Sequence, residues 1–243
     1  MIPIYLTSWH RQELTRLVIE AIYSRTKSPF TLTIFDNGSD AATQSWLISL
    51  LQKKVIHALH LERENTGVCY NKPVFHALTE TTTPYYVVTD NDFIPADGWD
   101  LKLIEIMEQD PELALLAPQY WPQWPMQVQG RRPGYWECIG VGNTFKMCRM
   151  SAMEKVFPLF PRRKMQFGDD GLLSDLVRSE GYRVGFAEDV FCWDLGNRSP
   201  ENHGGYTEAQ LASDPRKQGY NAHPPYEPQD WNTLRPREEL IYR

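Results

Sequence analysis

The sequence predicts an α/β fold, with a single domain and a mostly parallel central sheet flanked by helices. Four observations lead to this prediction. Short apolar segments alternate with amphipathic segments through the first third of the chain, and polar turn sequences follow several of the apolar segments. The 243 residues fit one large domain without an internal linker, and the 42% apolar residues are enough to form a substantial core.

The pattern of the first third indicates three strands and two helices. Ile2–Leu6 and Phe30–Phe35 are compact apolar segments that predict strands, and Val55–Leu61 predicts a third. Between them, RQELTRLVIEAIYSR and WLISLL carry apolar residues at helical spacing. This βαβα order implies a parallel sheet, which binds ligands beyond the carboxyl ends of its strands. Thr7–Arg11 and Asp36–Ser39 would lie at those ends.

The middle of the chain predicts one more strand and helix before a long loop. Tyr85–Thr89 reads as a strand that runs directly into Asp90–Asp92. A helix follows, with Asp97 as its N-cap and Asp100 in its first turn, where the helix dipole favours an acid. Residues 118–136 are rich in Pro, Trp, Gln and Arg and predict a loop.

The last part of the chain completes the predicted domain. Its expected elements are a strand, a helix and a strand, over Glu137–Arg149, Asp170–Glu180 and Tyr182–Asp194. Gly181 is placed to end the helix. We expect the domain to span residues 1–196 and the polar, proline-bearing residues 197–243 to form an irregular extension packed on it or trailing from it.

Composition excludes several classes of protein. The net charge of −6 argues against nonspecific binding to nucleic acid or to an anionic membrane. No apolar segment approaches the length of a membrane span, and the first residues resemble a strand rather than a signal peptide. The four cysteines are widely spaced without a C-x-x-C pair, which favours a reduced, cytoplasmic protein without structural zinc.

The acidic turn Asp90–Asp92 is the first candidate for chemistry. Mg²⁺ and Mn²⁺ prefer hard oxygen ligands, and a diphosphate needs such a cation to offset its charge. Two carboxylates spaced i, i+2 after a strand can divide the work between a metal and a ribose. Alone the pattern is weak, because about one D-x-D match is expected by chance in a chain of this composition. A solvated turn is the alternative.

Three further polar clusters follow predicted strands or open a helix. Asp36–Ser39 could hold a base or ribose, and Glu64–Gly67 with Asn71-Lys72 follows the third strand. Gly168–Gly171 presents two adjacent carboxylates at the positive end of a helix. Each has an ordinary alternative, namely turn chemistry for the first two and an N-cap for the last. It is their order along the chain that carries information.

In that order, the chain resembles the inverting glycosyltransferases of family 2, which have the GT-A (Rossmann-like) fold. The resemblance runs from the first strand to about Gly196. It rests on IPIYLTSWHR, TIFDNGSD, ENTGVCYNK, YYVVTDND and FGDDGLLSDLVRSEGYRVGF in succession. It implies a transferase that moves a sugar from a nucleotide-diphosphate sugar to an acceptor hydroxyl with inversion, and that uses Mn²⁺ or Mg²⁺.

The resemblance also implies roles for individual residues. The residues expected to contact the nucleoside of the donor are Thr7, Arg11, Asp36 and Asn65. Asp90 would bind the ribose or the metal, and Asp92 the metal that bridges the diphosphate. Asp170 would be the general base that takes the proton of the acceptor hydroxyl as it attacks C1.

This chain departs from the family pattern at two positions. The base motif reads Asp169-Asp170 where the family often has Glu-Asp, so the second acid is assigned as the base with Asp169 beside it. Asp194 stands where the family commonly has a metal-binding histidine, and it fits Mg²⁺ or Mn²⁺ as a hard ligand. His203 is the alternative source of a metal ligand.

The acceptor is not identified by the sequence. Tyr120–Trp124 offers aromatic faces on which sugars or bases could stack, and Pro161–Lys164 could bind phosphate; core filling and a solvated turn are the alternatives. A glycan, a protein or a nucleic acid such as a modified DNA base all remain open as acceptors.

Two rival functions also remain. A nucleotidyltransferase would normally carry a glycine-rich basic loop after the first strand, which TSWHRQE lacks. A catalytically inactive carbohydrate- or partner-binding domain would have no need of Asp90, Asp92 and Asp170 together.

Overall fold

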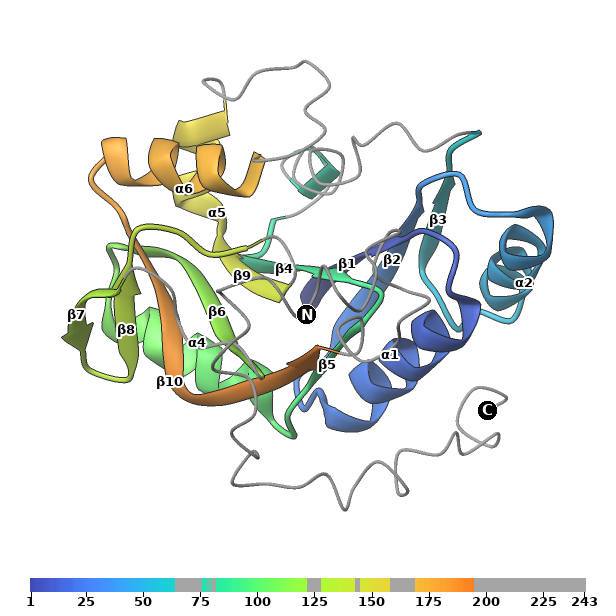
Figure 1. The fold of residues 1–243 in the computed structure, drawn as a ribbon, viewed down its shortest axis with the longest axis horizontal. Helices are drawn as coiled ribbons and strands as arrows, with labels where there is room; N and C mark the ends of the chain where they lie inside the picture. Colours follow the sequence, from blue (N-terminus) through green and yellow to red (C-terminus); the bar gives the residue numbers. More distant parts are fainter. Residues whose placement is uncertain are drawn as a thin grey trace, which may run out of the picture.

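A computed structural model of the chain describes residues 1–63, 76–77, 79, 82–121, 128–142, 145–157 and 169–194. The molecule is built on one large mixed sheet with the strand order β3-β2-β1-β4-β9-β6-β10-β8-β7, and β5 pairs with β10 at the side of this path. Helices cover the sheet, as Figure 1 shows. The predicted α/β class is therefore confirmed.

The first half of the sheet is parallel. It consists of β1 (Ile2–Ser8), β2 (Phe30–Asp36), β3 (Ala58–Leu61) and β4 (Tyr85–Asp90). β1 lies between β2 and β4 and runs parallel to both. All seven residues of β1 are buried, as is typical of a central parallel strand whose two faces are both covered. The sequence pattern predicted these strands correctly, with ends displaced by up to three residues.

The second half of the sheet is largely antiparallel. Its strands are β5 (Phe93–Pro95), β6 (Leu113–Trp121), β7 (Val128–Arg132), β8 (Tyr135–Cys138), β9 (Phe145–Arg149) and β10 (Arg183–Asp194). β9 pairs antiparallel with both β4 and β6, and β10 is parallel to β6 alone. The prediction of a mostly parallel sheet thus holds for the first half and fails for the second.

Five described helices flank the sheet. They are α1 (Gln12–Arg25), α2 (Ala41–Gln52), α4 (Trp99–Gln109), α5 (Met150–Val156) and α6 (Asp169–Ser179). In Figure 1, α5 and α6 lie together on one side of the sheet, with α1 and α4 on the other. Trp99 of α4 packs edge-on against Phe145 of β9, with ring centroids 4.9 Å apart. No helix in the described ranges has the length and hydropathy of a membrane span.

Three sequence predictions need correction here. The predicted loop 118–136 contains the end of β6, all of β7 and the start of β8. These strands were missed because β7 is exposed on both faces and carries glycine and arginine where an apolar alternation was sought. The predicted strand Glu137–Arg149 is divided between β8 and β9.

The start of α4 also differs from its prediction. Gly98, with φ +65°, is the N-cap residue, and the predicted cap Asp97 forms a surface ion pair with Lys27 instead. Asp100 does lie in the first turn, but it is fully buried and accepts hydrogen bonds from the backbone nitrogens of Lys27 and Ser28. It therefore joins α4 to the loop before β2. The predicted end of α6 at Gly181 agrees with its positive φ of 83°.

Candidate active site

The carboxyl ends of β1, β2 and β4 form the predicted ligand edge of the sheet. In the parallel register, Ser8 lies opposite Asp36, and Thr7 lies opposite Asp90. The segments that follow these strands therefore meet at one edge, although Thr7 and Asp90 are 83 positions apart in the sequence.

The buried carboxylate of Asp36 stabilises the turn between β2 and α2 through hydrogen bonds. Its carboxylate accepts hydrogen bonds from the backbone nitrogen of Ser39 at 3.0 Å, from the hydroxyl of Ser39 and from Nε2 of Gln44 at 2.9 Å. The residue is fully buried, and such donors are what stabilise a buried carboxylate. A direct contact with a nucleoside would require a rearrangement of these hydrogen bonds, so that role stays a prediction.

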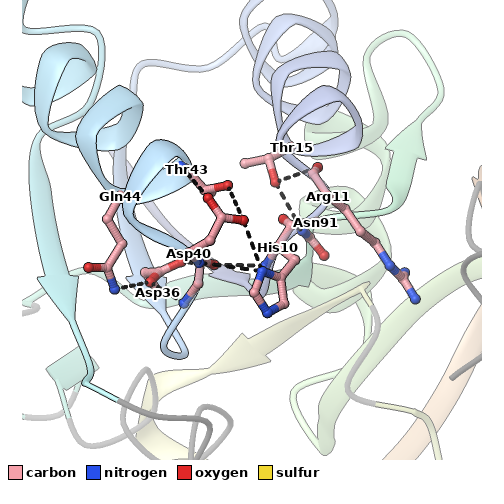
Figure 2. Close-up of polar contacts among 9 residues, drawn as sticks. His10, Arg11, Thr15, Asp36, Asp40, Thr43, Gln44 and Asn91 are labelled. Atoms are coloured by element: carbon pink, nitrogen blue, oxygen red, sulfur yellow. Dashed lines mark hydrogen bonds and ion pairs between the residues drawn. The ribbon is translucent and has the colours of Figure 1, made fainter.

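Ser39 and Asp40 connect this turn to the loop after β1. The backbone nitrogen of His10 donates to Oγ of Ser39 at 2.7 Å, and Nδ1 of His10 lies 3.2 Å from Oδ2 of Asp40 (Figure 2). Asp40 is also the N-cap of α2, where it accepts from the backbone nitrogen of Thr43 at 2.9 Å. The hydrogen bond from Thr43, together with that from His10, lowers the pKa of Asp40. The two loops are thus fixed relative to each other.

Asn91, the middle residue of the acidic turn, holds the loop after β1 in place. It is buried, and its Nδ2 donates to the backbone oxygen of His10 at 3.3 Å and to Oγ1 of Thr15 at 2.9 Å (Figure 2). His10 and Arg11 both have a φ of 53°, a left-handed conformation that is uncommon and strained for residues other than glycine. Asn91 therefore joins the end of β4 to an unusual backbone segment.

The two outer residues of the acidic turn each contact the end of β1 or the loop after it. Oγ1 of Thr7 donates to Oδ1 of Asp90 at 2.5 Å. Nη1 of Arg11 lies 2.7 Å from Oδ2 of Asp92, and their side chains are 25% and 15% exposed. Burial raises the pKa of Asp92, and the charge of Arg11 only partly opposes this effect. Arg11, predicted to contact the nucleoside, is paired here with the predicted metal ligand.

The carboxylates of the acidic turn fit a metal ion that the phosphates of a bound substrate also help to coordinate. Among the described residues, Oδ1 of Asp92 is buried and has no hydrogen-bond partner, so one hard oxygen is left for a cation. Within the described ranges, no three His, Cys, Asp or Glu side chains come together as a metal site. Mg²⁺ and Mn²⁺ are commonly held by one or two carboxylates together with substrate phosphates, which is the arrangement that Asp90 and Asp92 would provide.

The end of β10 returns to this acidic turn. In the antiparallel pair of β10 and β5, Asp194 lies opposite Phe93, the residue that follows Asp92. The backbone therefore brings the third predicted metal ligand beside the first two, over a separation of about a hundred residues. Only the backbone of Asp194 is described, as is also true of Asp169 and Asp170 in the first turn of α6.

Two further residues near this edge escaped the sequence analysis. Trp9 follows β1 and is 45% exposed, with its ring centroid 5.1 Å from that of His10. Lys146 is fully buried in β9 and lies opposite Val88, two residues before Asp90 and hence on the same face of β4 as that residue. A lysine within the apolar segment FKMC was a signal that could have identified it, because fully buried lysines are rare.

Some predicted residues lie outside the described part of the chain. They are Asn65 and its neighbours Glu64–Gly67, Asn71-Lys72, residues 122–124 of the aromatic segment Tyr120–Trp124, Pro161–Lys164 and His203.

The sequence profile of Glycosyl transferase family 2 matches residues 2–157, which is well over half of the chain. The match includes β1 to β9 and every residue of the acidic turn. A search of curated protein sequences finds no match.

Three solved structures with similar folds are distant from this chain in sequence. A mannosyltransferase from Pyrobaculum calidifontis, in complex with GDP-Man and Mn²⁺, is 15% identical with a TM-score of 0.60, and the match covers 80% of this chain and 56% of that one. GalNAc-T7 with UDP, GalNAc and Mn²⁺ is 10% identical with a TM-score of 0.66, over 97% and 53%. TarS 1-349 of S. aureus is 13% identical with a TM-score of 0.57, over 83% and 61%.

These likenesses establish the fold. The chain spans between 53% and 61% of the length of the three proteins.

Proposed function

The chain belongs to glycosyl transferase family 2, and on that premise we propose that it transfers a sugar from a nucleotide-diphosphate sugar to an acceptor hydroxyl, with inversion and with the help of Mn²⁺ or Mg²⁺. The observation that carries the proposal is the acidic turn at the ligand edge. There Asp90 contacts Thr7, Asp92 contacts Arg11, and one buried oxygen of Asp92 has no hydrogen-bond partner within the described ranges.

Asp92 would bind the metal, with Asp90 and Asp194 completing its protein ligands or, in the case of Asp90, holding the ribose. The register that sets Asp194 opposite Phe93 supports this set. The metal would supply positive charge to the departing nucleotide diphosphate, which lowers the barrier to its release. Two of the structural neighbours were solved with Mn²⁺ and with GDP-Man or UDP, in keeping with such a site.

The nucleoside of the donor would lie over the loops after β1 and β2. Asp36 would support this surface from below through the turn that it closes, and Asn65 would contribute from the segment after β3. The exposed ring of Trp9 suits stacking against a flat base, because an indole face binds such surfaces with little loss of conformational entropy.

Asp170 would act as the general base. It belongs to the first turn of α6, and in the view of Figure 1 this is the end of α6 nearer β4. A carboxylate within reach of the acceptor hydroxyl can take its proton while the oxygen attacks C1 from the side opposite the leaving diphosphate, and this geometry gives inversion. Glycans, proteins and nucleic acids are all acceptors to test.

The proposal is tested by a panel of nucleotide sugars assayed with and without Mn²⁺. We expect hydrolysis or transfer to require the cation, and Asp92→Ala to abolish turnover while its Tm stays near that of the wild type. Asp97→Ala is the matched control, since Asp97 is an exposed carboxylate that pairs with Lys27 at the start of α4. Full activity in excess EDTA would refute the metal role.

A further inference from the structure

We propose that Arg11 pairs with the carboxylate of Asp92 when neither cation nor nucleotide is bound. When a nucleotide diphosphate binds, Arg11 leaves this carboxylate and a divalent cation takes its place, so that the binding of cation and nucleotide is coupled. This inference rests on the proposed function and adds to it an order of events at the same carboxylate. In the resting enzyme the guanidinium would therefore be a competitor of the metal.

The competition follows from the contacts of Asp92. Nη1 of Arg11 lies 2.7 Å from Oδ2 of Asp92, and this is a charge-assisted hydrogen bond to the carboxylate that would have to face the metal. The remaining oxygen, Oδ1, is buried and finds no hydrogen-bond partner in the part of the chain that the structure describes. A divalent cation at that oxygen would stand beside the positive charge of Arg11. Repulsion between the two should make binding of the cation alone weak.

A nucleotide diphosphate removes this conflict because it offers Arg11 a second anion. A guanidinium binds phosphate with the same planar fork that it uses for a carboxylate. When Arg11 turns to the diphosphate, both oxygens of Asp92 face the cation, and the phosphates add ligands of their own. Each ligand then strengthens the binding of the other by the same factor, as thermodynamic linkage requires.

The local fold would allow this exchange as a movement of one side chain. Asn91 fixes the backbone oxygen of His10 and the hydroxyl of Thr15, which lie on either side of Arg11 in the sequence. In Figure 2 the side chain of Arg11 extends away from His10 and Asp40, and hydrogen bonds of His10 with Ser39 and Asp40 join the two loops. The loop can thus keep its shape while Arg11 changes partner.

Binding of Mn²⁺, followed by the electron paramagnetic resonance of the free ion, tests the exchange without any transfer assay. The wild type and Arg11→Gln are titrated with Mn²⁺ alone and then with Mn²⁺ plus GDP or UDP. We expect Arg11→Gln to bind Mn²⁺ alone about 10-fold more tightly than the wild type, which lies within the usual range of coupling between sites. The nucleotide should strengthen Mn²⁺ binding strongly in the wild type and only slightly in the variant.

Arg16→Gln is the matched control, because Arg16 lies in α1, which begins directly after Arg11, and pairs with Glu13 on the surface. It should titrate like the wild type, and Arg11→Lys should fall between the wild type and Arg11→Gln. The exchange is overturned if Arg11→Gln binds Mn²⁺ alone no more tightly, or if the nucleotide strengthens its Mn²⁺ binding as much as in the wild type. If the wild type fails to bind Mn²⁺ even when GDP or UDP is present, the proposed function is overturned together with the exchange.

Discussion

Two carboxylates that pair with arginine show how differently the two halves of the molecule use the same chemistry. Asp92, in the first half, shares one oxygen with Arg11 and leaves the other buried without a hydrogen-bond partner. Asp110, at the end of α4, accepts from Tyr135, from Arg183 and from the backbone nitrogen of Glu112.

The difference separates the proposed ligand site from a structural cluster. Asp110 is saturated with donors and ties α4 to β8 and β10, far from the carboxyl ends of the parallel strands. Around Asp92 the backbone is strained at His10 and Arg11, and a buried oxygen lacks a partner. Strain and unsatisfied polar atoms persist where a ligand later compensates for them. We therefore propose a ligand-binding role for the pair of Asp92 with Arg11 and a stabilising role for the pair of Asp110 with Arg183.

The largest effect is expected where the second half is proposed to join the chemistry. Asp170→Asn should lower kcat by about 10²–10⁴-fold with the donor Kd nearly unchanged, because it removes a general base and little volume. Asp169→Asn should cause a smaller loss in the same transfer assay, accompanied by a lower Tm if Asp169 caps α6. If Asp169→Asn is the inactive enzyme, the base assignment must be reversed. A large change in donor Kd for Asp170→Asn would instead move the donor site toward α6.

The next effect concerns the close packing of the second half. A Cβ atom added at Gly185 would lie 2.4 Å from a ring carbon of Tyr135 and 2.8 Å from the backbone oxygen of Trp136. Gly185→Ala should therefore destabilise the protein by about 3 kcal/mol, the upper part of the usual range for overpacking. Gly130→Ala is the control, because nothing lies within 4 Å of its added Cβ. Chemical denaturation of both variants measures the difference, and equal stabilities would contradict it.

The smallest expected effect tests the comparison of the two carboxylates directly. Asp110→Ala leaves the buried hydroxyl of Tyr135 without its acceptor and should lower the free energy of unfolding by about 2 kcal/mol. Asp92→Ala should change it much less, because ionised Asp92 is already disfavoured by burial. Urea denaturation of the two variants in parallel decides the point, and a larger loss for Asp92→Ala would reverse the assignment of roles.

The contribution of Asp110 should also depend on pH. Burial raises its pKa, but the hydrogen bonds from Tyr135 and Arg183 outweigh this and hold the pKa below its usual value of 3.8. The unfolded chain therefore takes up the proton first as pH falls. The stabilisation by Asp110 should be complete above that value and disappear as pH falls through the depressed pKa, where Asp110→Ala and the wild type should converge.

The sequence alone determined most of the first half. Parallel strands are recognisable as continuous apolar segments, and their carboxyl ends lie at one edge of the sheet whatever the loops contain. The polar motif that follows each strand could therefore be placed at that edge from the sequence. Strand order predicted that Thr7, Asp36 and Asp90 lie at or near the carboxyl ends of their strands, and the register sets Thr7 opposite Asp90 and Ser8 opposite Asp36. Their roles toward a donor and a metal came from the family resemblance and stay predictions. The end of α6 at Gly181 was equally local, because a single residue with positive φ decides it.

Only the tertiary structure decided the rest, because the deciding contacts join residues distant in sequence. No local pattern distinguishes β7, which is exposed on both faces, from a loop, and its strand character comes from pairing with β8. Asn91 is held by its hydrogen bond to Thr15, which lies 76 positions away in the sequence. Arg11 and Asp92, which form an ion pair, are 81 positions apart. The sequence can name the residue types that a site needs, but the partner of each charge is set by the packing of strands that meet only in the folded protein.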